Sequence, residues 1–283
     1  MSMDLVLQGA AIDGALIDRL TGLANATGHR TTSRGVRLTD VKSDTTTRSA
    51  VDAACRAARV DHGFIESHKR LSDYGLVVMD MDSTLITIEC IDEIADMLGI
   101  KKDVAVITEA TMRGEIRNFE ESLRRRVALL AGLDVSALQR VYDERLKVSP
   151  GGERMLEEDR AAGLQSLLVS GGFTFFTEKL KARLKLDHAH ANTLGIADGK
   201  LTGKVEGRIV DNNVKAELVK STCAALGIPT SKAIVMGDGA NDLTMMGLAG
   251  ISVAYHAKPV VRAQTSHAID FGGLDVMTGW FAQ

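Results

Sequence analysis

The sequence predicts an α/β fold built around a parallel sheet, and three observations support this. Short continuous apolar runs occur at residues 76–79, 164–169, 233–236 and 251–254. Such runs are typical of strands that are buried on both faces of a parallel sheet. Helical apolar patterns separate the runs, and clusters of polar residues and glycines follow them.

The first 73 residues are expected to form a small N-terminal domain of mixed strands and helices. Residues 3–8 alternate as a short strand, and residues 13–26 carry a helical apolar pattern. Residues 31–41 are predicted as a second strand and residues 48–60 as an alanine-rich helix. Because no catalytic constellation occurs here, a regulatory domain, a dimerisation surface and a structural extension all stay open as its role.

The rest of the chain is expected to form a Rossmann-like core, residues 74–88 and 150–283, with a helical cap at residues 89–149. The cap segment carries helical patterns and no strand signal, and the sequence Pro-Gly-Gly at 150–152 ends it. Residues 194–209 are rich in glycine, with Asp198-Gly199 at their centre, which predicts a β-hairpin.

Charge, cysteines and hydropathy exclude several classes of protein. The formal net charge of −3 over 283 residues does not favour nucleic acid or an anionic membrane as a partner. The three cysteines are far apart and form no CxxC pair, so neither a disulfide framework nor a zinc site is indicated, and each is expected in the core. Without a signal peptide or an apolar run long enough to cross a bilayer, a cytoplasmic protein is expected.

Two aspartates leave the end of the first core strand together. Asp80 and Asp82 follow the apolar run 76–79, and ligands of open α/β sheets bind beyond the carboxyl ends of the strands. A carboxylate beside a divalent cation stays ionised and can act as a nucleophile, while a second one can move protons. By itself, an aspartate-rich turn with a helix cap at Ser83 or Thr84 is an equal alternative.

Three further clusters follow later runs. Ser170 precedes two glycines whose backbone amides can form a phosphate cradle, and Lys215 begins a helical pattern. The segment 237–242, Gly-Asp-Gly-Ala-Asn-Asp, offers Asp238 for a cation site. Asp80, Asp82 and Asp238 together predict a Mg²⁺ site, because Mg²⁺ takes one or two carboxylates in addition to water and substrate oxygens.

The four clusters, in this order, resemble the four motifs of the haloacid dehalogenase superfamily over about residues 76–283. The resemblance narrows to the phosphoserine phosphatases in the segments 79–93, 112–114, 118–127, 170–173 and 237–243. It implies that Asp80 is the nucleophile and a metal ligand. It also implies that Asp82 protonates the leaving group, activates water and offers its backbone carbonyl to Mg²⁺, while Asp238 completes the protein ligands.

The same resemblance implies how the phosphoryl group is held. Ser170, the amide of Gly171 and Lys215 are expected to contact its oxygens, and Lys215 is expected to offset the acids around Asp80. The implied reaction is hydrolysis of O-phospho-L-serine to L-serine and phosphate, the last step of L-serine biosynthesis.

The resemblance also implies a pocket for the serine group of the substrate. Glu89 is expected to bind the ammonium group and Arg126 the carboxylate, which a planar guanidinium can bond at both oxygens. Met112 and Phe119 are expected to form an apolar wall, and Asn241 to contact the substrate. Without the resemblance, Arg126 would be interpreted as an exposed charge, and Met112 and Phe119 as packing within the cap.

Other functions stay open at this stage. The same aspartyl-phosphate could pass phosphate to another alcohol, which would make the protein a phosphotransferase. Phosphothreonine, homoserine phosphate, a sugar phosphate or a nucleotide are alternative substrates, and a silent binding module is disfavoured by the intact Asp80, Asp82, Lys215 and Asp238. The expected partner is a small molecule rather than nucleic acid or a membrane, and a homodimer is left open.

Overall fold

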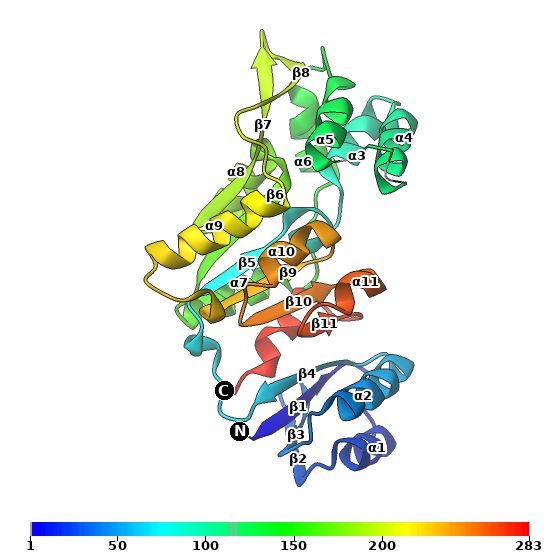
Figure 1. Ribbon diagram of the computed structural model, residues 1–283, viewed down its shortest axis with the longest axis vertical. Helices are drawn as coiled ribbons and strands as arrows, with labels where there is room; N and C mark the ends of the chain where they lie inside the picture. Colours follow the sequence, from blue (N-terminus) through cyan, green and yellow to red (C-terminus); the bar gives the residue numbers. More distant parts are fainter. Residues whose placement is uncertain (1, 114, 117, 283) are drawn as a thin grey trace.

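A computed structural model describes residues 2–113, 115–116 and 118–282, except for the side chain of Met112. Its centre is one sheet of eleven strands in the order β2-β3-β1-β4-β11-β10-β9-β5-β6-β7-β8 (Figure 1). The strands are β1 Met3–Gln8, β2 Gly28–Thr32, β3 Gly35–Thr39, β4 Asp61–Glu66, β5 Leu76–Met79, β6 Gln165–Phe173, β7 His188–Ala197, β8 Lys200–Glu206, β9 Ala233–Gly237, β10 Ile251–Tyr255 and β11 His267–Ile269.

The parallel strands form the middle of the sheet, and β5, β9 and β10 are buried throughout. Strand β5 pairs in parallel with both β6 and β9, and β10 pairs in parallel with β9 and β11. Leu76 and Val78 pack into one apolar cluster, while Val77 and Met79 pack into another on the opposite face. The sheet is covered by the helices α7 Gly152–Ala161, α8 Thr174–Leu184, α9 Asn212–Ala225, α10 Leu243–Met246 and α11 Pro259–Arg262.

The cap segment is helical, as predicted. It contains α3 Cys90–Met97, α4 Lys101–Met112, α5 Phe119–Ala128 and α6 Ser136–Glu144. These helices lie together at the far end of the molecule from the N-terminal strands (Figure 1). The predicted hairpin is also confirmed, since β7 and β8 pair antiparallel around Asp198-Gly199. Its second strand contacts the cap through the hydrogen bond from Gly132 N to Leu201 O, 2.8 Å long.

The N-terminal segment adds four antiparallel strands, with the helices α1 Gly14–Ala24 and α2 Thr45–Ala58. The strand predicted at residues 31–41 is confirmed in part: β3 lies within it, but the chain turns at residues 33–34 and β2 forms an antiparallel hairpin with β3. Strands β4 and β11 were not predicted. Both carry polar residues where an apolar run would have been the signal, and β11 has only three residues.

Strands β4 and β11 join the N-terminal segment to the core sheet. His62 pairs antiparallel with Ala268, and the carboxylate of Asp61 accepts hydrogen bonds from the backbone amides of residues 270–272. One continuous sheet therefore runs through the N-terminal segment and the core. The domain boundaries proposed at residues 73 and 149 stay predictions.

Buried polar contacts reinforce this junction. Arg37 is 2% exposed, forms a 3.0 Å ion pair with Asp4 and donates a hydrogen bond to the carbonyl of Trp280. Arg262 of the core pairs with Asp52 of α2. The three cysteines are buried and free, as predicted, and no helix in the described part of the chain is long and apolar enough to cross a membrane.

One buried carboxyl group in α7 has no hydrogen-bond partner among the described residues. Asp159 is 1% exposed, and neither of its side-chain oxygens is paired. Burial, and then the neighbouring charge of Glu158, raise the pKa of Asp159 to about 8. The folded protein therefore favours the protonated form of this group at neutral pH.

Stability should consequently fall as the pH rises, because the folded pKa of Asp159 lies above its unfolded value near 4. The stability that the protonated Asp159 contributes to the folded state is fully present below about pH 4 and declines as the pH approaches 8. We therefore compare the free energy of unfolding of Asp159→Asn with that of the unmodified protein at pH 5.5 and at pH 8.5. The difference between the two proteins should shift by about 3 kcal/mol in favour of the variant over this range. Urea denaturation at both pH values measures this, with the exposed Glu157→Gln on the same helix as control. A difference that does not change with pH would contradict the prediction.

Candidate active site

The first site residue lies where β5 ends. Asp80 follows Met79 directly and is 5% exposed. The next five residues, Met81–Leu85, form a turn in which Asp82 and Ser83 depart from helical geometry and Ser83 has a φ of 55°. Few non-glycine residues adopt this left-handed region, and strain of this kind is often found at functional sites.

A buried lysine links two of the predicted motifs. The Nζ of Lys215, on the first turn of α9, lies 2.7 Å from Asp80 Oδ1 and 2.8 Å from Asp242 Oδ1. Lys215 is 1% exposed and Asp242 is fully buried. Burial alone would lower the pKa of Lys215, but Asp80 and Asp242 outweigh it and raise that pKa. Burial, followed by the charge of Asp242, raises the pKa of Asp80, and Lys215 opposes this rise.

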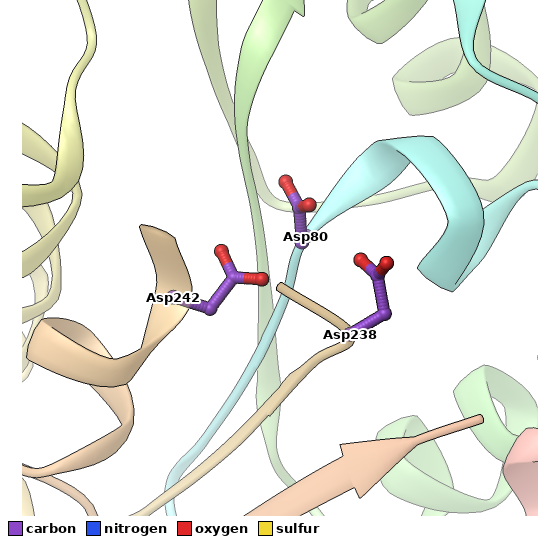
Figure 2. A group of neighbouring side chains, drawn as sticks. All are labelled: Asp80, Asp238 and Asp242. Atoms are coloured by element: carbon purple, nitrogen blue, oxygen red, sulfur yellow. The ribbon is translucent and has the colours of Figure 1, made fainter. Parts of the chain in front are cut away.

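Three carboxylates form a group that can hold a cation. Oxygens of Asp80, Asp238 and Asp242 lie within 4.8 Å of one another, and Figure 2 shows Asp80 at the end of its strand between the other two. Asp242 accepts hydrogen bonds at both oxygens, from Lys215 and from Gly239 N. Asp80 and Asp238 each accept at one oxygen, from Lys215 and from Thr84. The second oxygens of Asp80 and Asp238 are therefore the available ligands.

This group differs from the predicted carboxylate set in one member. Asp242 belongs to it and the carboxylate of Asp82 does not. The prediction assigned only the backbone carbonyl of Asp82 to the metal, and that assignment stays a prediction. Burial, and then Asp242, raise the pKa of Asp238 to about 6. A cation in this group would favour the ionised form of each acid.

The carboxylate of Asp82 lies on another side of the site. It accepts a hydrogen bond from Cys90 N at 3.3 Å, and a Cβ at Gly172 would approach its Oδ2 to 2.8 Å. Only glycine therefore fits at position 172 without a shift of Asp82. Burial, and then the charge of Glu89, raise the pKa of Asp82 to about 7. A carboxyl group with such a pKa can both give and take a proton near neutral pH.

The end of β6 supplies hydrogen-bond donors. Ser170 Oγ accepts a hydrogen bond from Gly172 N at 2.8 Å, which leaves the hydroxyl proton free to be donated elsewhere. Asn192, 1% exposed, donates to Gly171 O and accepts from Val210 N, both at 2.8 Å. Asn192 thus ties the end of β6 to the chain that leads into α9.

A cavity of about 230 Å³ lies between this site and the cap. That is below the 300–1,000 Å³ of pockets for drug-sized ligands, so the cavity suits a smaller molecule. Its lining brings together most of the predicted residues: Asp80, Asp82, Glu89, Phe119, Arg126, Ser170, Gly171, Asp238 and Asn241, with Ile91, Leu123, Gly172 and Phe173. Lys215 lines the adjoining cavity with Phe119, Gly171 and Asn241. The side chain of Met112 lies outside the described residues.

Arg126 differs from the arginines beside it in the sequence. Arg124 and Arg125 each pair with a glutamate one turn earlier on the exposed side of α5. Arg126 forms no ion pair with any described residue and donates only from Nε, to Ser122 O at 3.4 Å. Glu89 likewise has no cationic partner in the described part of the chain and accepts from Ser83 Oγ at 2.6 Å. The cavity therefore holds one cation and one anion that are both available.

Two site residues were missed by the sequence reasoning. Asp242 was within a quoted motif, and its spacing of four residues from Asp238 was the available signal. Asn192 lies inside β7, where no motif marks it. The assembled site combines a cation site, hydrogen-bond donors beside a buried lysine, and a carboxyl group that can move protons. Such a set can bind and transfer an oxyanion.

Comparisons with known proteins agree with this chemistry. Residues 77–247 match the family model of haloacid dehalogenase-like hydrolases. A phosphoserine phosphatase of Polaromonas sp. is 54% identical over 210 residues, which cover 73% of this chain and 89% of that protein. A haloacid dehalogenase family hydrolase of Salmonella enterica serovar Typhi has a similar structure, with a TM-score of 0.90, 30% identity, and coverage of 100% of this chain and 99% of that one. A probable phosphoserine phosphatase of Vibrio cholerae has a TM-score of 0.84 and 36% identity, over 99% of this chain and 86% of that one.

The buried lysine should matter for folding as well as for chemistry. We expect Lys215→Met to lower the free energy of unfolding by about 3–5 kcal/mol, because it leaves two buried acids without their counter-charge. Urea denaturation in EDTA measures this. The exposed Lys220→Met on the same helix serves as control and should change stability little. Equal stability of both variants would show that Asp80 and Asp242 do not depend on Lys215.

Proposed function

The chain belongs to the haloacid dehalogenase-like hydrolases, and we propose that it is a metal-dependent phosphoserine phosphatase. It hydrolyses O-phospho-L-serine to L-serine and phosphate, as the name of its relative from Polaromonas indicates for that protein. The reaction proceeds through a phosphate ester of Asp80, and the resident cation is Mg²⁺.

One observation supports this substrate above others. Glu89 and Arg126 line the same cavity as Asp80, and neither forms an ion pair with a described residue. Phosphoserine carries an ammonium and a carboxylate beyond its phosphate, and these two groups complement Glu89 and Arg126. A neutral sugar carries neither charge, so it would gain no charge-assisted hydrogen bond from either side chain.

The acid group at the ends of β5 and β9 fits a hard divalent cation. The free oxygens of Asp80 and Asp238 would hold it, with the backbone carbonyl of Asp82 as a further ligand, and Asp242 would support the arrangement through Lys215. Mg²⁺ prefers a few carboxylates together with water and phosphate oxygens. When bound, it supplies positive charge to the phosphoryl oxygens.

In the first step a carboxylate oxygen of Asp80 bonds to phosphorus, and the bond from phosphorus to the serine oxygen breaks. Asp82 gives its proton to that oxygen, so L-serine leaves as a neutral alcohol. The Ser170 hydroxyl, the Gly171 amide and Lys215 hold the phosphoryl oxygens, because phosphoryl transfer depends on positioning and on neutralising their charge.

In the second step a water molecule attacks the phosphorus of the aspartyl-phosphate. Asp82, now ionised, takes the proton of the water, and phosphate leaves as Asp80 is restored. We propose that residues 89–149 act as a cap that excludes bulk water, with Met112 and Phe119 as its apolar wall and Asn241 at the substrate. Phe119 and Asn241 line the cavity and Met112 ends α4.

The reaction can be tested by phosphate release from L-phosphoserine, L-phosphothreonine, a sugar phosphate and a nucleotide, each with Mg²⁺ and with EDTA. We expect release from phosphoserine to dominate and to stop in EDTA. Asp80→Asn should remove turnover, because an amide is a poor nucleophile. Its circular dichroism spectrum should stay unchanged and its thermal unfolding should stay cooperative. Full activity of Asp80→Asn would overturn the nucleophile assignment, and a preference for the sugar phosphate would overturn the substrate assignment.

Arg126 should determine specificity rather than the chemical step. We expect Arg126→Ala to lower kcat/KM for phosphoserine by roughly tenfold or more, because a charge-assisted hydrogen bond to the carboxylate is lost. Activity on p-nitrophenyl phosphate, which has no carboxylate, should change much less. Arg125→Ala is the matched control, since Arg125 pairs with Glu121 and is exposed. Equal losses on both substrates would show that Arg126 does not bind the carboxylate.

A further inference from the structure

A second polar cavity lies where the N-terminal segment meets the core. Its volume is about 470 Å³, and its walls come from α2, β4, α11 and β11. It shares no lining residue with the two cavities beside Asp80 and Lys215. His62 of β4 and Ala268 of β11, which pair with each other, both line this cavity. The N-terminal strands and the core strands therefore both contribute to it.

The charges around this cavity leave one arginine available. Arg262 pairs with Asp52, which also lines the cavity, and with Asp270. Arg48 is half-buried and lies over the ring of Phe64, 4.5 Å from its centroid. Its Nε donates to Ser43 O at 2.9 Å, and its two terminal nitrogens have no hydrogen-bond partner among the described residues. Arg48 therefore presents two aligned donors and an uncompensated positive charge.

The other polar groups favour an anion as the ligand. His267 is held by Ser266 Oγ at 2.9 Å and by Phe64 O at 3.0 Å, and burial lowers its pKa to about 4. His62 is partly buried, and desolvation lowers its pKa to about 4, so both rings favour the neutral form at physiological pH. Thr45 and Ser49 of α2 add hydroxyl groups beside Arg48. Of the charged groups that line the cavity, Asp52 pairs with Arg262, which also pairs with Asp270, so Arg48 is the one without a carboxylate partner among the described residues.

We propose that this cavity binds a small oxyanion, a carboxylate or a phosphate, with Arg48 as its charged ligand. The guanidinium fork of Arg48 matches two oxygens of either group. The hydroxyls of Thr45 and Ser49 donate to the remaining oxygens. A ligand held there contacts the N-terminal segment and the core together.

The protein contains a natural probe of this cavity. Trp280 is the only tryptophan of the chain, and it stacks on His267 with ring centroids 4.7 Å apart. It also lies against the backbone of Gly63, where an added Cβ would come within 2.8 Å of its Nε1. Because Gly63 and His267 line the cavity, tryptophan fluorescence should report on a ligand there.

The test is a fluorescence titration with inorganic phosphate and, separately, with L-serine. Phosphate and L-serine are chosen because they are the products of the proposed reaction, and only this choice rests on the proposed function. At least one probe should give a saturable change, and Arg48→Gln should weaken it about tenfold or more. Arg56→Gln, which changes an exposed arginine outside the cavity on the same helix, should leave it unchanged. A response to phosphate alone identifies a phosphate site, and a response to L-serine identifies a carboxylate site.

Thermal unfolding gives a second measurement if the fluorescence is insensitive. The probe should raise the Tm of Arg56→Gln more than that of Arg48→Gln, because binding at the active site is common to both variants. Equal responses of the two variants in both measurements, or no response of the unmodified protein in either, would overturn the site. Phosphate release from phosphoserine is measured separately, so a failure of the proposed function is seen independently of this result.

Discussion

The site depends on one buried electrostatic contact, the pairing of Lys215 with Asp80 and Asp242. The three residues come from α9, from the end of β5 and from the turn after β9, so the contact holds three separate parts of the chain in register. Two acids and one lysine leave a net negative charge in a buried place. Such a group is unfavourable alone and becomes favourable when a cation shares it. The same imbalance that makes this group costly by itself therefore suits it to hold a cation.

The positions of the chemical residues follow from the parallel sheet. Asp80 and Asp238 directly follow β5 and β9, Ser170 lies in β6 just beyond its last residue paired with β5, and neighbouring parallel strands point to the same edge. Sequence reasoning could predict this convergence because apolar runs mark the strands. It could not separate the roles of Asp238 and Asp242, since that depends on the turn Ala240–Asp242, which directs Asp242 towards Lys215. Asn192 was not predictable either, because its role arises from contacts with Gly171 and Val210, which are distant in the sequence.

The N-terminal part of the fold was less predictable for a related reason. Strand β2 is mostly exposed and polar, and β4 pairs with the three-residue strand β11 only through His62 and Ala268. Strand β2 is held by its backbone pairing with β3, and β4 is joined to the segment after β11 by the hydrogen bonds that the Asp61 carboxylate accepts from backbone amides. Periodicity detects strands that bury one or both faces, and it gives no signal for strands that are held by polar contacts to a distant segment.

In the cap, the arginines that pair with a carboxylate differ in role from the arginine that does not. The paired arginines keep the surface soluble, and the unpaired one can bind a ligand. Within the run of three arginines on α5, helical geometry brings Arg124 and Arg125 beside acids four residues earlier, where they form exposed pairs. The residue four before Arg126 is Ser122, which offers only its carbonyl oxygen, so the guanidinium has no intrahelical acid to pair with. Arg48 differs from Arg262 at the second cavity in the same way. A half-buried arginine without a carboxylate keeps its affinity for an anion. In both places, therefore, the arginine whose pairing the fold leaves incomplete is the one that can recognise a ligand.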